Sequence, residues 1–147
     1  ALPKLGHRNW IAVVDSAYPE QVQPGVTIVY VGGDQAEILD AVLKRLDEAK
    51  HVRPEVMVDA ELAGVSEEAA PGIEAYRTRL KGVLGAREAQ SVAHEKIIGE
   101  MGKAAESFRV LVLKTDLTLP YTSVFLRLDC AYWDAKREAD LRKRLSK

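Results

Sequence analysis

Histidines and carboxylates stand at several points of the chain where they could move protons. His7 precedes a short apolar run that ends at Asp15, and His94 opens a helical pattern after Ser91. An imidazole titrates near neutral pH, so it can act as a general acid or a general base. These residues are therefore the first candidates for catalysis by proton transfer.

His7 lies just before the first predicted strand, and Asp15 lies at the far end of that strand. A strand rises ~3.3 Å per residue, so an extended chain separates them by more than about 20 Å. They could share a site only if the chain folds back at His7, or if another subunit brings its own copy. The alternative is that Asp15 caps the following turn with Ser16 and that His7 is an ordinary loop residue.

His94 stands where the partial positive charge of a helix N-terminus would act on its ring. This charge disfavours the imidazolium, which keeps the ring neutral and able to accept a proton. The alternative is a surface histidine on an amphipathic helix.

The loop Pro120-Tyr121-Thr122-Ser123 enters the last predicted strand. A tyrosine beside hydroxyl-bearing neighbours can donate hydrogen bonds to a polyol and stack on the face of a sugar. The alternative is a tyrosine that packs at the end of a sheet.

Other chemistry has weak or no support in the sequence. Gly32-Gly33-Asp34 lies between a strand and a helix, but it lacks the dinucleotide-binding spacing and has an acidic residue where phosphate would sit. There is no Walker sequence, no Gly-Xaa-Ser-Xaa-Gly elbow and no histidine pair at metal-ligand spacing. The sequence therefore predicts no metal site.

Composition limits the remaining classes. The chain has 147 residues and a net charge of -1, which gives no electrostatic reason to expect a nucleic acid or a membrane surface as partner. The apolar run 11–14 is far shorter than the ~20 residues of a membrane span. The single cysteine, Cys130, excludes an internal disulfide and a thiolate zinc site of the usual kind.

Strand and helix patterns alternate along the chain, which predicts an α/β fold. Apolar or β-branched runs predict strands at 10–15, 26–31, 55–60, 109–114 and 123–129. Helices are expected after the N-cap Asp34, from about 71 to 85, over 91–106 and over 132–147. We expect a single domain with a largely parallel sheet flanked by helices. Ligands in such folds bind at the edge formed by the carboxyl ends of the strands.

Several of these motifs, in this order, resemble the ribose pyranase and fucose mutarotase (RbsD/FucU) family. The similarity is found in Leu5-Gly6-His7, in Ile11 to Pro19, in His94-Glu95, in Ala105-Glu106-Ser107 and in Pro120-Tyr121. By this resemblance, residues 1–131 form the mutarotase-like domain, and the charged helix 132–147 is an extension beyond the family's usual end.

The resemblance implies an enzyme that interconverts anomers or ring forms of a free monosaccharide without a cofactor. It implies His7 as the main acid/base residue, Asp15 as the residue that orients His7 or the sugar, and His94 and Tyr121 as further proton-transfer or hydroxyl-binding residues. Arg8 and Ser123, which adjoin these motifs, are the substrate-binding candidates. It also implies a ring-shaped homo-oligomer, commonly pentamer-based, in which a neighbouring subunit completes each site.

Two positions depart from the family pattern. Asn9 stands where the family has an acidic residue, and Ser123 stands where the family has asparagine. Serine keeps a hydroxyl but loses the paired donor and acceptor of an amide, which alters contacts to a sugar. Two alternatives to catalysis therefore remain open: a sugar-binding domain without activity, and a structural or interaction module that uses the C-terminal helix.

The cysteine count also bears on the compartment. A lone thiol without a disulfide partner favours a cytoplasmic protein. The chain begins at Ala1, so an exported protein is the alternative if a leader was removed.

Overall fold

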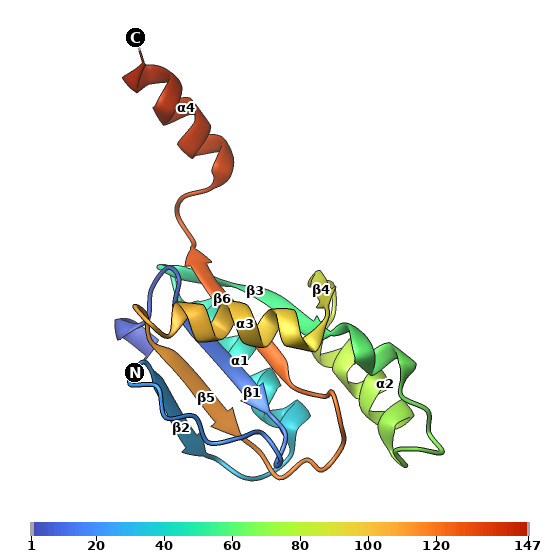
Figure 1. Cartoon of the computed structure of the whole chain (residues 1–147). Helices are drawn as coiled ribbons and strands as arrows, with labels where there is room; N and C mark the ends of the chain where they lie inside the picture. The colour runs from blue at the N-terminus through green and yellow to red at the C-terminus, as the bar shows by residue number, and fades with distance from the viewer. Residues whose placement is uncertain (1, 147) are drawn as a thin grey trace.

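A mixed six-stranded sheet forms the centre of the computed structural model, which describes residues 2–146 (Figure 1). The strands are β1 (Trp10–Val14), β2 (Val26–Tyr30), β3 (Val52–Asp59), β4 (Ala89–Val92), β5 (Val110–Lys114) and β6 (Val124–Cys130). The α-helices are α1 (Gln35–Glu48), α2 (Ile73–Leu84), α3 (His94–Ala104) and α4 (Ala135–Leu145), and the 3-10 helices are η1 (Leu2–Lys4) and η2 (Ala60–Gly64).

The strands lie in the order β2-β5-β1-β6-β3-β4, and only β6 runs against the others. β1 pairs in parallel with β5, where Trp10 faces Val110, and antiparallel with β6, where Val13 faces Val124. The beginning of β6 consequently lies at the same sheet edge as the carboxyl ends of β1 and β3.

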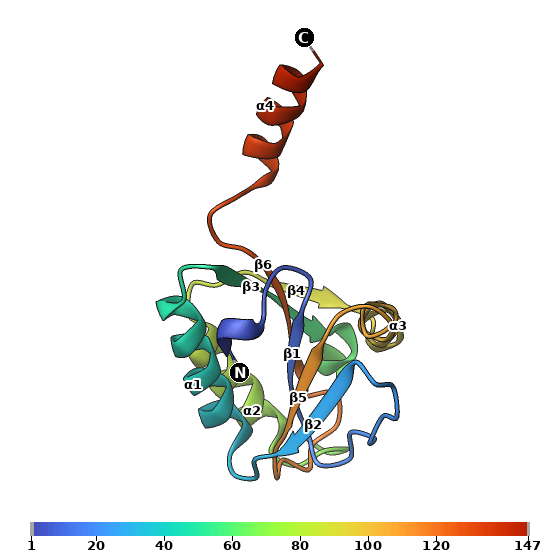
Figure 2. The ribbon, with the colours of Figure 1, turned by 90° about the vertical axis from the view of Figure 1, so that its left-hand side faces the viewer.

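Helices cover both faces of the sheet (Figure 2). α1 and α2 pack on one face through a core that includes Leu39, Leu43 and Ile73. α3 packs on the opposite face through Ile97 and Met101. The result is a three-layer α/β domain, which confirms the predicted fold class.

Most predicted elements are confirmed, and the caps explain where two of the helices begin. Asp34 accepts a hydrogen bond from the Glu37 amide at 3.0 Å, so α1 begins at Gln35. The last helix begins at Ala135, three residues after the predicted start at Tyr132. Asp134 accepts a hydrogen bond from the Arg137 amide and thereby sets this start.

Two parts of the sheet differ from the prediction. β4 was missed because its four residues, Ala-Gln-Ser-Val, form an exposed edge strand without apolar alternation. β3 begins at Val52, three residues before the predicted start at Glu55, and runs through Pro54. Pro54 is accommodated because β4 pairs with β3 only from Val56 onward, so the strand has a single neighbour at Pro54.

The C-terminal helix α4 projects away from the domain in both views (Figures 1 and 2). None of its residues is buried. Within residues 2–146, every helix is too short or too polar to cross a membrane.

Candidate functional site

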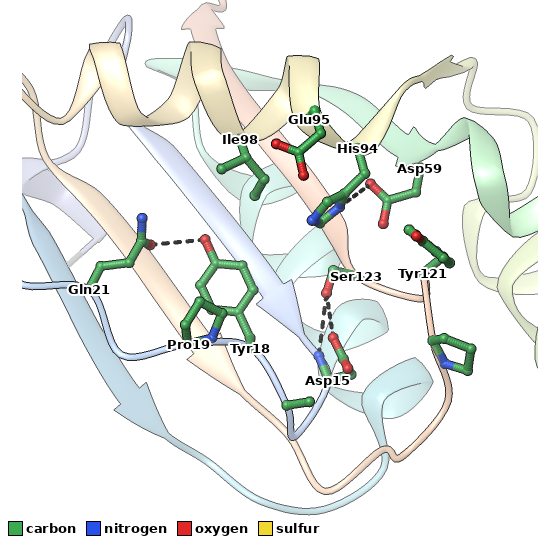
Figure 3. A pocket seen from close by; sticks show the side chains of 12 residues that line it. Asp15, Tyr18, Pro19, Gln21, Asp59, His94, Glu95, Ile98, Tyr121 and Ser123 are labelled. Atoms are coloured by element: carbon green, nitrogen blue, oxygen red, sulfur yellow. Dashed lines mark hydrogen bonds and ion pairs between the residues drawn. The ribbon is translucent and has the colours of Figure 1, made fainter.

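A pocket of about 410 Å³ opens at the sheet edge where β1 and β3 end and β6 begins (Figure 3). Asp15 follows β1, Asp59 ends β3 and Ser123 precedes β6. Because β1, β6 and β3 are neighbours in the sheet, the reversed direction of β6 brings these three side chains together. The position is the carboxyl edge at which ligands of open α/β folds bind.

His94 enters the pocket from the first turn of α3. Its Nδ1 lies 2.9 Å from Oδ1 of Asp59. The histidine side chain is 30% exposed, whereas Asp59 is 1% exposed. The helix N-terminus predicted for His94 is confirmed, and a buried carboxylate that the sequence analysis did not consider holds the imidazole.

Burial raises the pKa of Asp59 above 3.8; the hydrogen bond from His94 opposes that shift, and the nearby Glu61 and Asp15 add to it. Only Oδ1 of the carboxylate has a partner. Within residues 2–146, Oδ2 of Asp59 is the one buried side-chain nitrogen or oxygen without a hydrogen bond. Asp59 therefore occupies an environment that disfavours its charge.

Asp15 and Ser123 form a second polar pair in the pocket. The Ser123 hydroxyl donates to Oδ1 of Asp15 at 3.0 Å and accepts from the Asp15 amide at 3.4 Å. Ser123 is only 3% exposed, so this pair holds the Asp15 carboxylate in one orientation. The other carboxylate oxygen, Oδ2, takes no part in this pair.

Tyr121 borders the pocket from a strained loop position. Its φ of 55° lies in the left-handed region, which is uncommon for a bulky residue. Its ring meets His94 edge-to-face, with 5.8 Å between the centroids. The next residue fixes the loop because the carbonyl of Thr122 accepts hydrogen bonds from Gln35 and from the hydroxyl of Tyr76, both buried.

The charge of the pocket is negative. Asp15, Asp59 and Glu95 line it, and none of its lining residues within 2–146 is lysine or arginine. Tyr18 adds a hydroxyl that donates to Gln21 at 2.9 Å, and burial raises the pKa of Tyr18 to about 12. The hydroxyl therefore stays protonated at neutral pH, and the pocket offers mostly hydrogen-bond acceptors.

The structure brings together four of the six residues singled out from the sequence: Asp15, His94, Tyr121 and Ser123. His7 and Arg8 lie at the opposite end of β1. There Nδ1 of His7 lies 2.9 Å from Oδ1 of Asp129, and the guanidinium of Arg8 lies 5.7 Å from the centre of the Phe108 ring. A single chain therefore does not place His7 or Arg8 in the pocket.

Asn9, one of the two departures from the family pattern, supports the loop beside His7. Its Oδ1 accepts from the Gly6 amide at 2.7 Å, and its Nδ2 donates to the carbonyl of Arg109. The glycine turn before α1 is likewise occupied, because the Gly33 amide donates to Asp116 at 2.7 Å. The Gly33 amide is therefore not free to bind a phosphate.

The sequence did not identify the buried residues that hold the pocket side chains and their loop in place, which are Asp59, Gln35 and Tyr76. Asp59 carried one usable signal: like Asp15, it is an aspartate at the end of a predicted buried strand, at the edge where ligands bind. Gln35 and Tyr76 carried none, because a polar residue at the start of a helix and a tyrosine in a helical stripe are common in proteins without sites.

Solved structures similar to this chain include RbsD and FucU proteins, although no family model and no curated protein matches it. Bacillus subtilis RbsD, solved with D-ribose, is 19% identical, with 86% of each chain covered and a TM-score of 0.56. FucU from Bifidobacterium longum is 19% identical, with 86% and 88% covered and a TM-score of 0.57. The fucose mutarotase of Streptococcus pneumoniae, solved with L-fucose, is 17% identical, with 86% of each chain covered and a TM-score of 0.57. The chain therefore has the RbsD/FucU fold that its motifs predicted.

Proposed function

We propose that this protein is a cofactor-independent isomerase that interconverts anomers or ring forms of a free monosaccharide. The observation that carries the proposal is the convergence of His94, Asp15, Tyr121 and Ser123 on one pocket. The fold supports it, because proteins of this fold have been solved with D-ribose and L-fucose.

The reaction needs two proton transfers and no redox step. A base takes the proton of the anomeric hydroxyl, the bond between C1 and the ring oxygen breaks, and an acid protonates that oxygen. The resulting open chain carries a carbonyl at C1. Rotation about the C1–C2 bond and closure by the reverse steps give the other anomer, so the acid and the base return to their starting states.

The pocket residues suit these steps. His94 is the base candidate inside the pocket, because its ring is partly exposed there and held by Asp59. Asp15 accepts a hydrogen bond from a sugar hydroxyl, while Ser123 keeps its carboxylate in place. Tyr121 lies beside His94 at the rim, where its hydroxyl binds the sugar or passes on a proton.

His7 enters the proposal through a second copy of the chain. Its imidazole is 56% exposed and Asp129 orients it, so it can reach into the pocket of a neighbouring copy. In that assembly His7 is the main acid/base residue, Arg8 approaches the sugar beside it, and a ring-shaped homo-oligomer forms the complete site.

One observation favours a second candidate, a domain that binds a monosaccharide without catalysis. The pocket of a single chain contains only one imidazole, His94, among its lining residues within 2–146. Saturable sugar binding with exchange at the spontaneous rate would identify this second function.

NMR exchange spectroscopy on free monosaccharides tests the proposed function. We expect the protein to accelerate anomer exchange of at least one neutral sugar from a panel that includes D-ribose and L-fucose. The phosphorylated form of that sugar should be a poor substrate, because the pocket contains three carboxylates. Exchange at the spontaneous rate for the whole panel would contradict the proposal.

A further inference from the structure

Strand β3 and the helical turn after it hold both the backbone and the ring of His94. Asp59 ends β3 and contacts Nδ1 of the ring at 2.9 Å. Glu61, in η2, accepts a hydrogen bond from the His94 amide at 3.0 and 3.3 Å to its two carboxylate oxygens. One carboxylate thus fixes where the residue stands, and the other fixes how its ring is turned.

The contact with Asp59 also decides which ring nitrogen carries the hydrogen. When Asp59 is ionised, its carboxylate can only accept a hydrogen bond, so Nδ1 is then the donor. In a neutral imidazole the other nitrogen, Nε2, then has the free lone pair. Figure 3 shows that this second nitrogen faces the pocket, away from Asp59.

We propose that Asp59 is a positioning residue: it holds His94 in the Nδ1–H tautomer, so that Nε2 faces the sugar as a base, and it stabilises the imidazolium formed when Nε2 takes up a proton. This inference rests on the proposed function, in which His94 is a base of the reaction. Asp59 itself does not touch the sugar in this account.

Burial argues against a role in packing alone. Asp59 is 1% exposed, and its Oδ2 has no partner. An apolar residue would fill the same volume without that unsatisfied oxygen. The partial positive charge at the N-terminus of α3 disfavours a charged imidazole, and the negative charge of the Asp59 carboxylate counteracts this effect. The presence of a carboxylate at position 59 is therefore explained by its contact with the His94 ring and not by packing.

The matched variants are Asp59→Asn and Glu61→Gln. Each replaces a carboxylate by an amide of the same shape, but only Asp59 contacts the ring. Asp59→Ala serves as a third variant, because it removes the acceptor completely. The ¹⁵N chemical shifts of the His94 ring, measured without sugar and assigned with His94→Gln, report the tautomer directly.

We expect wild type and Glu61→Gln to show the Nδ1–H tautomer. Asp59→Asn and Asp59→Ala should shift the ring toward the Nε2–H tautomer. In the exchange assay, Asp59→Asn should lower kcat by about 10- to 100-fold with little change in KM, as expected for a group that acts through the base.

The two readouts separate the inference from the function on which it rests. Unchanged ring shifts in both Asp59 variants, or wild-type kcat in Asp59→Asn, would overturn the role of Asp59. If wild type does not accelerate exchange, the proposed function fails. In that case the ring shifts still decide whether Asp59 sets the tautomer.

Discussion

One carboxylate–imidazole pair, Asp59 with His94, lies at the carboxyl ends of β1 and β3. A second pair, Asp129 with His7, lies at the opposite end of these strands, and the two pairs differ in solvent exposure. In the pocket, Asp59 is 1% exposed and His94 30%. At the opposite edge, Asp129 is 25% exposed and His7 56%. Water screens the more exposed Asp129–His7 pair more strongly, so the geometry of that pair is held less firmly. The geometry of the Asp59–His94 pair is therefore held more firmly, whereas the Asp129–His7 pair is open to contact by a neighbouring molecule.

The raised pKa of Asp59 predicts how this residue affects stability as the pH changes. Protons bind Asp59 more tightly in the folded protein than at its unfolded pKa of 3.8, and burial is the main cause. The contribution of Asp59 to the stability of the fold is therefore fully present below the unfolded pKa of 3.8. It is lost as the pH rises through the higher pKa of Asp59 in the folded protein. Asp59→Asn removes this titration, so the variant should gain stability relative to wild type between about pH 4 and about pH 7.

Chemical denaturation of both proteins at the two pH values measures this difference. Glu61→Gln is the control, because it removes a neighbouring carboxylate that is not bonded to the ring. A relative stability of Asp59→Asn that stays constant or falls as the pH rises would contradict the assignment of Asp59 as a destabilised buried carboxylate.

At the residue level, the sequence identified the polar side chains that stand directly beside strand or helix ends. Asp15, His94 and Ser123 were singled out because they stand beside the ends of predicted elements and lie in or next to motifs that resemble the RbsD/FucU family. Asp59 was missed although it has the same setting as Asp15. Only the structure shows that Asp59 faces the ring of His94, because residues 35 positions apart in the chain give no local signal of their contact.

At the scale of elements, hydrophobic patterning predicted the strands but not their order or direction. The runs that became β1 and β6 are both mostly apolar, and nothing in either run specifies that β6 is reversed. That reversal places Ser123 beside Asp15. The arrangement follows from long-range pairing across the sheet, which single-sequence patterns do not encode.

Helix α4 is expected to be dispensable for folding. It has no buried residue, and it projects from the domain through a short connection. A chain that ends at residue 131 should therefore keep its unfolding midpoint to within about 2 °C, as for changes confined to the surface. Differential scanning calorimetry of the two chains measures this.

The same truncation tests the alternative role for this helix. If α4 recruits a partner or covers a neighbouring copy, its removal should change the oligomeric mass measured by light scattering. A fall in the midpoint by several degrees at constant mass would show instead that α4 packs on its own domain.

At the scale of the whole molecule, the positions of the two histidines define the kind of assembly that can form a complete site. His94 lies beside the carboxyl ends of β1 and β3, and His7 lies at the amino end of β1. Joining the His7 edge of one copy to the pocket of the next is a head-to-tail contact, and repeated contacts of this kind close into a ring if the rotation allows it. The ring-shaped homo-oligomer implied by the sequence motifs stays a prediction.

Subunit mixing tests whether each site is shared between copies. His7→Ala and His94→Gln should each abolish sugar exchange when the variant is produced alone. Co-expression of the two should restore activity, because about one site in four then receives both wild-type histidines from different copies. No restoration in oligomers of confirmed mixed composition would mean that His7 and His94 do not act in one shared site.

We propose that the pocket around His94 interconverts forms of a free monosaccharide. Exchange spectroscopy of D-ribose and L-fucose, with wild type and His94→Gln compared at equal concentration, tests it most directly. We expect wild type to accelerate exchange of one of these sugars or of a related one. His94→Gln, at the same unfolding midpoint, should lose about 10²-fold or more of that acceleration. Equal exchange rates with wild type, with His94→Gln and with no protein would contradict it.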